Sequence, residues 1–582
     1  MARRLFTCAL AALLGSAPPL APRADDDAPP KPSFGEEVEV VGSRPRSATA
    51  DPTAAATVVD ASRFEGEAKT VAELVATAPG VAVHQFGGLG QAATISLRGS
   101  TADQVQIFLD GLPLNSGGGG GVDLSRIPRA WIQRIEVVRG AEGAVYGLGA
   151  LGGAVNIVTR PAVAGAWSVE GSAGSFRTFE GSADGAIGGA GWGLLGALAT
   201  EGSDGRFDYV FDPTPNSPRP VLVTREHDGA FALGGLVKGW ARVGDGVLDA
   251  VLQASGGHRD LPGTPPNLTP SDGQRDARLG LVARFAQPIG TDVELRLSAS
   301  ARDDHLTVWL APFPDARQRD LQGDLAAEAV WTTGGQTLAF RAAGTAERLD
   351  VDGAASRSRR GLALTVSDDI APLAGRLHLT PALRWDALGA FHGPSAKIGA
   401  SYLLAGPLSV RASAGRAFRP PSFSELYLSQ GFLSANPDLV AETSWSGDLG
   451  LVATGRHGLA SVTGFAQVYE DLIVYEQDSF RRFKPFNDAK AQVRGLELEL
   501  ASTPLGPAGL TASGSYTLLL SETLRGPASV LGKDLPHRGR HRLFARLASS
   551  VRWLDAHVEA HHVSQAYQNV ANSAALRIPP AL

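Results

Sequence analysis

The sequence has almost no cysteine, a single methionine, little net charge and no long apolar segment after its first residues. The only cysteine is Cys8, and the only methionine is the initiator. A chain without further cysteines has no disulfide framework. The formal net charge of −6 gives no reason to expect a nucleic-acid partner. After residue 14 no apolar run reaches the length that a membrane-spanning helix needs, about 18 residues. A membrane β-barrel remains possible, because its strands are marked only by alternation.

The N-terminus has the pattern of a secretory signal. Arg3 and Arg4 precede a short apolar segment at residues 5–14, which small residues follow. We therefore predict a signal peptide over residues 1–24. Residues 25–45 are charged and rich in proline, which is typical of a flexible leader.

Glycine is abundant, with 70 of 582 residues, and the stretch 135–160 contains the pattern GxGxxG at residues 147–152. A dinucleotide-binding turn needs a strand that runs directly into the glycines and a helix that leaves them. Here the candidate strand 135–138 ends too early. Residues 154–161 alternate and end in proline, as a second strand does. We expect two strands joined by a tight glycine-rich crossover instead of a nucleotide site.

Residues 46–163 are predicted to form a compact α+β unit. A short helix is expected at 71–77, ended by Pro79 and Gly80. The segments ATISLRG and VQIFLDGLPL alternate like strands that Gly and Pro interrupt. The glycine run 117–121 is expected to be a flexible loop.

From residue 164 onward the sequence consists of two-faced strands. In residues 293–302, VELRLSASAR, apolar and polar residues alternate and so lie on opposite faces. Residues 496–500, LELEL, repeat the pattern with Glu497 and Glu499 on the polar face.

The spacing of these strands favours a membrane barrel over a soluble sandwich. Short turns alternate with long polar loops such as 203–226 and 256–276, which is the asymmetry of an outer-membrane barrel. Sandwich domains are usually about 100 residues long, whereas residues 164–582 show no break. We therefore predict an all-β transmembrane barrel. A barrel this wide needs a plug, and the unit at 46–163 can supply it.

An ordered set of motifs resembles the TonB-dependent outer-membrane receptors, and most closely their vitamin B12 receptors. EEVEVVGSR resembles the energy-coupling segment called the TonB box. Three later strings resemble the plug: TVAELVATAPGVAV, ISLRGSTADQVQIFLDGLPLN and DLSRIPRAWIQRIEVVRGAEGAVYGLGALGGAVNIVTR. Four more resemble barrel signatures: FRPPSFSELY, NPDLVAET, NDAKAQVRGLELEL and GKDLPHRGRHRL. The resemblance implies about 22 antiparallel strands around an N-terminal plug. Because the chain ends where the family enters its last strands, we expect it to be C-terminally incomplete by roughly 50–70 residues.

The resemblance implies ligand-gated import at the bacterial outer membrane, without enzyme activity or a required cofactor. A scarce metal chelate binds at the outer mouth. The partner TonB, driven by its inner-membrane energising complex, then adds a strand to the TonB box. The box would consist of Glu36, Glu37, Val38, Glu39, Val40, Val41 and Gly42. We expect a monomer in contact with outer-membrane lipid and no nucleic-acid partner.

Plug arginines of the family pair with carboxylates of the barrel wall. Arg98 and Arg139 each precede a glycine at a predicted strand end, and Glu497 and Glu499 are the candidate partners. The alternative is that these charges are simply solvated in the lumen.

Residues 81–99 are similar to the first plug apical loop of vitamin B12 receptors, so cobalamin is the favoured ligand. A ferric siderophore is the alternative within the same family. The resemblance assigns ligand contacts in two apical loops to Gln85, Phe86, Gly88, Gly90, Gln91, Asn115 and Ser116.

Vitamin B12 receptors of this family also bind Ca²⁺ through loop aspartates. Asp204, Asp208, Asp212 and Asp228 lie in or beside a long early loop, and calcium prefers carboxylate oxygens. Ordinary charged loop residues would give the same pattern.

Two other classes of protein fit the sequence less well. A passive porin would need neither a plug nor a TonB box. An enzyme would need a catalytic constellation, and the histidines of HRGRHRL and AHHVS have no carboxylate or cysteine at ligand spacing.

Overall fold

The computed structural model describes residues 51–212, 219–264, 267–429, 433–477, 482–551, 554–574 and 576–581. The predicted signal peptide and the whole predicted leader, with its TonB box, lie outside these residues. All described residues fall within one unit, residues 42–582.

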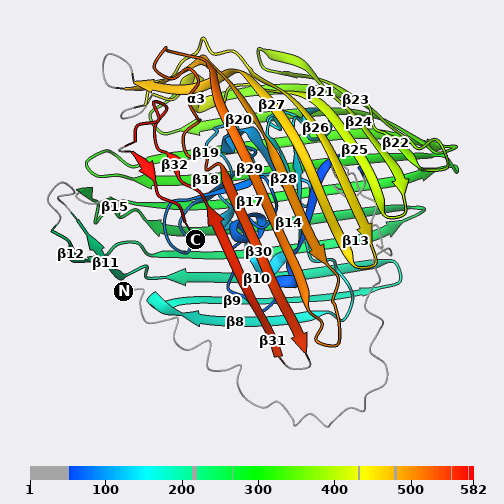
Figure 1. The fold of residues 1–582 in the computed structure, drawn as a ribbon, viewed down its shortest axis with the longest axis horizontal. Helices are drawn as coiled ribbons and strands as arrows, with labels where there is room; N and C mark the ends of the chain where they lie inside the picture. Colours follow the sequence, from blue (N-terminus) through cyan, green and yellow to red (C-terminus); the bar gives the residue numbers. More distant parts are fainter. Residues whose placement is uncertain are drawn as a thin grey trace, which may run out of the picture. The chain divides into compact units, whose positions relative to one another are not determined.

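The first described part, drawn in blue in Figure 1, is built on a five-stranded sheet with the order β1-β6-β7-β4-β5. Its strands are β1 (Ala55–Asp60), β4 (Val105–Leu109), β5 (Leu112–Pro113), β6 (Ile132–Arg139) and β7 (Gly153–Thr159). A separate hairpin pairs β2 (Val81–Gln85) with β3 (Ala93–Leu97). Mixed parallel and antiparallel pairing in the sheet agrees with the predicted α+β unit, which we call the plug.

Short helices connect the plug strands. The helix α1 (Val71–Val75) begins with a capping box, in which Thr70 and Glu73 bond each other's backbone N–H groups. It ends two residues earlier than predicted. The remaining short helices are η1 (Ala61–Phe64), η2 (Ala102–Gln104), η3 (Leu124–Arg126), η4 (Arg129–Trp131) and α2 (Gly143–Tyr146). No helix in the part of the chain that the structure describes is long and apolar enough to cross a membrane.

Antiparallel strands follow in chain order and close into a barrel, with β31 next to β8. The first ten are β8 (Trp167–Gly174), β9 (Thr178–Gly189), β10 (Trp192–Ser203), β13 (Ala230–Val243), β14 (Gly246–Asp260), β17 (Gly273–Ile289), β18 (Val293–Trp309), β19 (Ala316–Thr333), β20 (Gln336–Val351) and β21 (Arg357–Ile370). The next ten are β22 (Leu377–Leu379), β23 (Ala382–Leu388), β24 (Phe391–Ala405), β25 (Leu408–Arg419), β26 (Glu442–Gly455), β27 (Gly458–Gln477), β28 (Phe483–Ser502), β29 (Thr511–Arg525), β30 (His541–Val551) and β31 (Leu554–Val563).

The strands β22 and β23 both pair with β21 on one side and with β24 on the other, so together they occupy one strand position in the barrel. The resemblance gave about 22 strands. The expectation that the final strands lie beyond residue 582 stays a prediction.

Connections between barrel strands are short at one end and long at the other. Residues 190–191 and 244–245 form short turns, whereas residues 204–229 and 526–540 form long connections at the opposite end. Long loops mark the outer end of an outer-membrane barrel. The connections contain β11 (Phe207–Phe211), β12 (Val221–Arg225), β15 (Gly263–Thr264), β16 (Asn267–Leu268), η5 (Ser175–Arg177) and α3 (Phe423–Tyr427), and β32 (Ala566–Tyr567) and β33 (Arg577–Ile578) follow β31.

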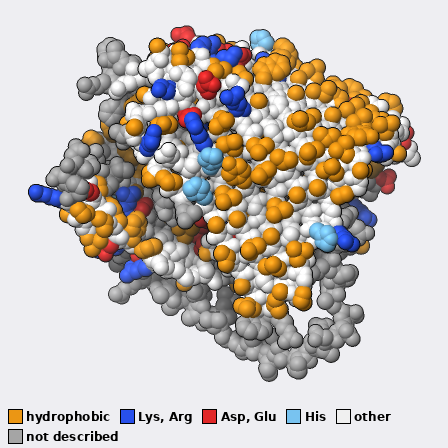
Figure 2. Space-filling view, viewed as in Figure 1, with side chains coloured by type: hydrophobic (Ala, Val, Ile, Leu, Met, Phe, Trp, Pro, Cys, Tyr) orange, Lys and Arg blue, Asp and Glu red, His pale blue; other side chains and the backbone are white. Residues whose placement is uncertain are grey.

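The two-faced strands of the prediction are confirmed. On β10, Leu194 and Leu198 are exposed, whereas the alternating Leu195 and Ala197 are buried toward the plug. Figure 2 shows hydrophobic side chains spread over the face of the barrel turned to the viewer. An apolar outer surface with a polar interior is what a barrel in lipid requires.

The plug lies inside the barrel, because its side chains contact strands on all sides. Gln91 bonds the end of β14, Ser116 bonds β19, Arg98 bonds β26 and β28, and Lys69 bonds β31. The plug core is apolar, and its fully buried members include Leu74, Ile95, Ile107, Ile135 and Ile157.

Candidate functional site

Arg98 joins the plug to the barrel wall through three charge-assisted hydrogen bonds. Its Nε and Nη2 donate to the two oxygens of Glu497 on β28, at 2.9 and 2.8 Å. Its Nη1 donates to Asp448 on β26 at 2.5 Å. The three side chains are 1%, 2% and 4% exposed, so water does not compete for these bonds. Burial alone would lower the pKa of Arg98, but the two carboxylates raise it above its ordinary value.

Arg139, the last residue of β6, extends this cluster. Its Nε lies 3.2 Å from Glu497, and its Nη1 donates to Thr57 at 2.9 Å. Thr57 in turn donates to Glu499 at 2.8 Å. The structure thus brings Arg98, Arg139 and Glu497 into direct contact and links Glu499 through one hydroxyl. Sequence reasoning missed Asp448, which lies two strands away from Glu497 in the sheet.

The first apical loop connects β2 to β3 and rests on the outer ends of β13 and β14. Gln91 is 4% exposed and donates to the backbone oxygen of Asp260 at 3.1 Å. A side chain at Gly90 would collide with Ala230. Phe86 is 71% exposed, Gln85 is also exposed, and the space around Gly88 is open. Of the five predicted contact residues in this loop, Gly90 and Gln91 hold the loop to the wall, while Gln85, Phe86 and Gly88 face outward.

The second apical loop follows β5. The side chain of Asn115 bonds its own plug, by accepting from the N–H of Ile107 at 2.7 Å and donating to Val105 at 2.8 Å, and its backbone oxygen accepts from Arg302 on β18 at 2.9 Å. Ser116 donates to Asp320 on β19 at 2.7 Å. The side chain of Asn115 therefore shapes the loop, and the backbone of Asn115 and the side chain of Ser116 fasten it to the wall.

The prediction of a flexible glycine run at 117–121 is wrong. The backbone N–H of Gly118 donates to Asp320 at 3.2 Å, and those of Gly120 and Gly121 each donate to Asp103 at 2.8 Å. The carboxylates that hold the run come from β19 and from η2. These contacts between distant residues fix a segment whose composition alone is that of a flexible loop.

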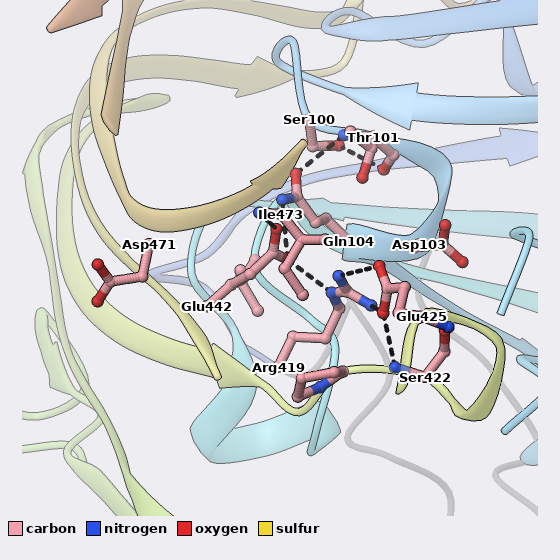
Figure 3. Close-up of polar contacts among 12 residues, drawn as sticks. Ser100, Thr101, Asp103, Gln104, Arg419, Ser422, Glu425, Glu442, Asp471 and Ile473 are labelled. Carbon is pink, nitrogen blue, oxygen red and sulfur yellow. Dashed lines mark hydrogen bonds and ion pairs between the residues drawn. The ribbon is translucent and has the colours of Figure 1, made fainter. Parts of the chain in front are cut away.

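Beside this loop, residues of three chain segments meet around Arg419 (Figure 3). Arg419, at the end of β25, donates to Glu442 at 2.6 Å and to both oxygens of Glu425 at 3.0 and 3.1 Å. The plug residue Gln104 donates to the same Glu442 at 3.1 Å. Sequence reasoning recognised the motifs FRPPSFSELY and NPDLVAET but named none of these residues. The signal was there, since Arg419 and Glu442 are charged residues of the two motifs.

The four aspartates proposed for calcium are not brought together. Each has its own partner: Asp204 pairs with Arg177, Asp208 accepts from Thr224, Asp212 accepts from the N–H of Arg219, and Asp228 pairs with Arg225. Among the described residues, no three or more His, Cys, Asp or Glu side chains gather where they would hold a metal ion. At the base of the β11–β12 hairpin the backbone of Gly205 lies against Asp228, yet the carboxylates of Asp204 and Asp228 pair with different arginines.

A cavity of about 300 Å³ separates the plug from the lumen face of β17–β24. It reaches from Gly117 at the outer loop to Asp51, the first described residue. Gly147 and Gly149 line it with φ of +90° and +86°, conformations that favour glycine. The strands before and after them, β6 and β7, pair antiparallel. The predicted crossover between two strands is thereby confirmed, and its glycines border the lumen.

Comparison with known protein families assigns both parts of the fold. Residues 224–581 match the family described as TonB dependent receptor-like, beta-barrel. Residues 48–154 match the TonB-dependent Receptor Plug Domain. The chain belongs to the TonB-dependent receptors.

Relatives of this receptor agree with the family. It is 28% identical over 455 residues to the vitamin B12 transporter BtuB of Photobacterium profundum, which covers 74% of this chain and 70% of that protein. The ferric yersiniabactin uptake receptor FyuA of Yersinia pestis superposes with a TM-score of 0.71 at 18% identity, covering 92% of this chain and 90% of FyuA. The siderophore receptor PirA of Pseudomonas aeruginosa superposes with a TM-score of 0.68 at 21% identity, covering 89% of this chain and 93% of PirA. At these identities the two structures support the fold alone.

The receptor is therefore an outer-membrane transporter that couples to TonB, and not an enzyme. The plug of this chain is held by the ion-paired cluster at Arg98 on one side and borders a cavity on the other.

Proposed function

We propose that this receptor imports cobalamin as a monomer. The observation that carries the proposal is its 28% identity to a vitamin B12 transporter over 74% of the chain. The similarity of residues 81–99 to the first apical loop of vitamin B12 receptors supports the same ligand. In the structure, Gln85 and Phe86 of that loop face outward, where an arriving ligand would meet them.

Equilibrium binding tests the proposal. Cyanocobalamin is titrated into the purified full-length receptor with and without Ca²⁺, and a panel of ferric siderophores is run in parallel. Saturable binding of cyanocobalamin supports cobalamin import. Binding of a siderophore in place of cyanocobalamin would reject it and leave the family unchanged.

We further propose that the loop aspartates bind Ca²⁺ together with the ligand. Since the four loop aspartates are separate in the structure, a calcium site would require the loop to rearrange. Tighter cyanocobalamin binding in Ca²⁺, lost when Asp204 and Asp208 are both changed to Asn, would support it. Equal binding with and without Ca²⁺ would reject it.

We also propose that residues 36–42 are the TonB box. Their β-prone sequence suits strand addition to a partner. A synthetic peptide of residues 36–42 should bind the purified periplasmic domain of TonB, and a scrambled peptide should not.

Import of a ferric siderophore is the second candidate. It is favoured by basic side chains that line the cavity between the plug and the wall, among them Arg296, Arg341 and Arg384, because they suit an anionic chelate.

A further inference from the structure

Basic side chains gather on the outside of the barrel, near the outer ends of the five neighbouring strands β17–β21. Neither the fold nor the proposed function has so far given them a role. We call them the outer basic patch, which consists of Arg275, His305, Arg317, Arg319, Arg348 and Arg360. All six side chains are exposed.

The neighbours of these residues in the chain show that the patch faces away from the lumen. On β19, Asp320 accepts a hydrogen bond from Ser116 of the plug, so the adjacent Arg319 lies on the opposite face of the strand. On β21, Arg359 borders the cavity beside the plug, so Arg360 lies on the outer face. The same alternation places the other four members outside.

The strand register joins these positions into one surface. Thr307 of β18 lies directly between Arg275 of β17 and Arg317 of β19. In the adjacent outward row, His305 lies opposite Arg319. Directly opposite residues of an antiparallel pair have Cβ atoms about 4.5–5.5 Å apart, so neighbouring members of the patch can contact the same headgroup.

The patch continues over the next two strands. Arg348 of β20 lies opposite Leu321, the outward residue that follows Arg319 on β19. On its other side it lies opposite Ser358 of β21, two residues before Arg360. The basic side chains therefore extend without a break from β17 to β21.

Positive charge exceeds negative charge in the patch, because its five arginines have only two aspartates among them. Asp303 accepts from Arg319 at 2.9 and 2.7 Å, and Asp350 accepts from Arg348 at 2.9 Å. Among the described residues, three arginine side chains of the patch have neither a hydrogen bond nor an ion pair: Arg275, Arg317 and Arg360. These three guanidiniums are available to an anion from outside the chain.

The patch lies at the outer edge of the apolar surface of the barrel. Farther along the same outer face, toward the short turns, the exposed residues include Leu279 and Leu281 on β17, Leu325 on β19 and Leu362 on β21. The patch itself adjoins the end of the barrel that carries the long loops, which is the outer end. It therefore lies where the headgroups of the outer leaflet meet the barrel.

We propose that the outer basic patch binds a phosphate-bearing lipid of the outer leaflet, whose acyl chains cover the leucines beside it. Guanidinium groups bind phosphate oxygens through paired N–H donors, and basic residues near a membrane surface attract anionic headgroups. Because the patch faces away from the lumen, this inference does not depend on which chelate the receptor imports.

The first test is binding of lipid A, a lipid that carries two phosphate groups. It is titrated into the full-length receptor in detergent micelles, and the bound lipid is measured by native mass spectrometry. The wild type should bind it. The combined variant Arg275→Gln, Arg317→Gln and Arg360→Gln should bind it roughly 100-fold more weakly. Equal affinity in this variant would overturn the proposal.

A charge-matched control removes three exposed arginines outside the patch, in the connections around β11 and β12: Arg177→Gln, Arg206→Gln and Arg219→Gln. This variant should bind lipid A like the wild type. An equal loss of binding in the control would show that only the net charge matters, and would reject the patch as a site.

Two comparisons identify the group that is bound. Lipid A without its phosphates should bind the wild type as weakly as lipid A binds the patch variant. Inorganic phosphate should displace lipid A no better than chloride at the same ionic strength does. Displacement by phosphate alone would make free phosphate the ligand and would reject a lipid occupant.

Photo-crosslinking in whole cells tests the position of the lipid. Thr307→benzoylphenylalanine places the probe between Arg275 and Arg317, and Val293→benzoylphenylalanine places it on the same face at the other end of β18. Lipid A should crosslink to the probe at Thr307 and not to the probe at Val293. No crosslink at Thr307, or equal crosslinks at both positions, would contradict the inference.

Discussion

At the scale of single residues, Glu497 compensates two positive charges of the plug. It contacts both Arg98 and Arg139 and is 2% exposed. In Glu497→Gln, Arg98 would keep only Asp448 as a carboxylate partner. Removing one member of a buried ion pair typically costs about 3–5 kcal/mol. We expect the plug of this variant to unfold at a lower urea concentration than the wild type. Tryptophan fluorescence would monitor the unfolding. Glu522→Gln, an exposed change on the neighbouring β29, should leave the midpoint unchanged.

His84 makes the stability of the receptor depend on pH. Its pKa in the folded protein is about 4, below the value of about 6.5 for a free histidine. The unfolded chain therefore binds the proton more readily, so stability falls as the pH drops from about 6.5 toward 4. The effect is at most about 3 kcal/mol.

Urea unfolding at pH 7 and pH 4.5 measures this loss. His84→Gln should lose less stability than the wild type over this interval, because glutamine does not titrate. His392→Gln changes an exposed histidine and should behave like the wild type. An identical loss in His84→Gln and wild type would contradict the assignment.

At the scale of elements, alternation and turn chemistry predicted the strands well. The face of β10 and the antiparallel pair β6–β7 both follow from the local sequence. What composition could not show is contact between distant segments. The run 117–121 is held by hydrogen bonds that include carboxylates from η2 and β19.

For the candidate site, too, the sequence indicated single residues but not the contacts between distant segments. Resemblance to the family named Arg98 and Glu497, but not Asp448, because pairing across β27 depends on strand register that motifs do not carry. The aspartates near β11 are close in sequence, yet each meets a different partner. Proximity in sequence was a poor guide there, since the individual partner of each carboxylate decides where it points.

Gly153 gives a test at this scale. It has a φ of +142°, and a side-chain carbon there would collide with the backbone oxygen of Val138. Gly153→Ala should destabilise the plug sheet by about 1–3 kcal/mol, from backbone strain and displacement of β6. Hydrogen exchange of the amides of β6 and β7 would report it. Gly88→Ala, where nothing lies within 4 Å, is the matched control and should exchange like the wild type.

At the scale of the whole molecule, the proposed function assigns binding and energy coupling to different segments. The apical loops face the outer end, whereas the predicted TonB box at residues 36–42 precedes the plug. Deleting residues 36–42 should therefore leave binding of the chelate to whole cells intact and abolish its TonB-dependent uptake. Cells carrying wild-type receptor without TonB provide the comparison. Uptake by the deletion variant at the wild-type rate would place the coupling segment elsewhere.

The position of the plug also constrains how the receptor can be made. The plug precedes every barrel strand in the chain, yet Arg98 and Lys397 bond across the boundary deep inside a barrel in which β31 lies next to β8. A folded domain of this size could not be threaded into a finished cylinder past those buried charges. We therefore expect the plug to be in place before β8 and β31 come together. The barrel of this receptor would then close around a plug that is already inside it.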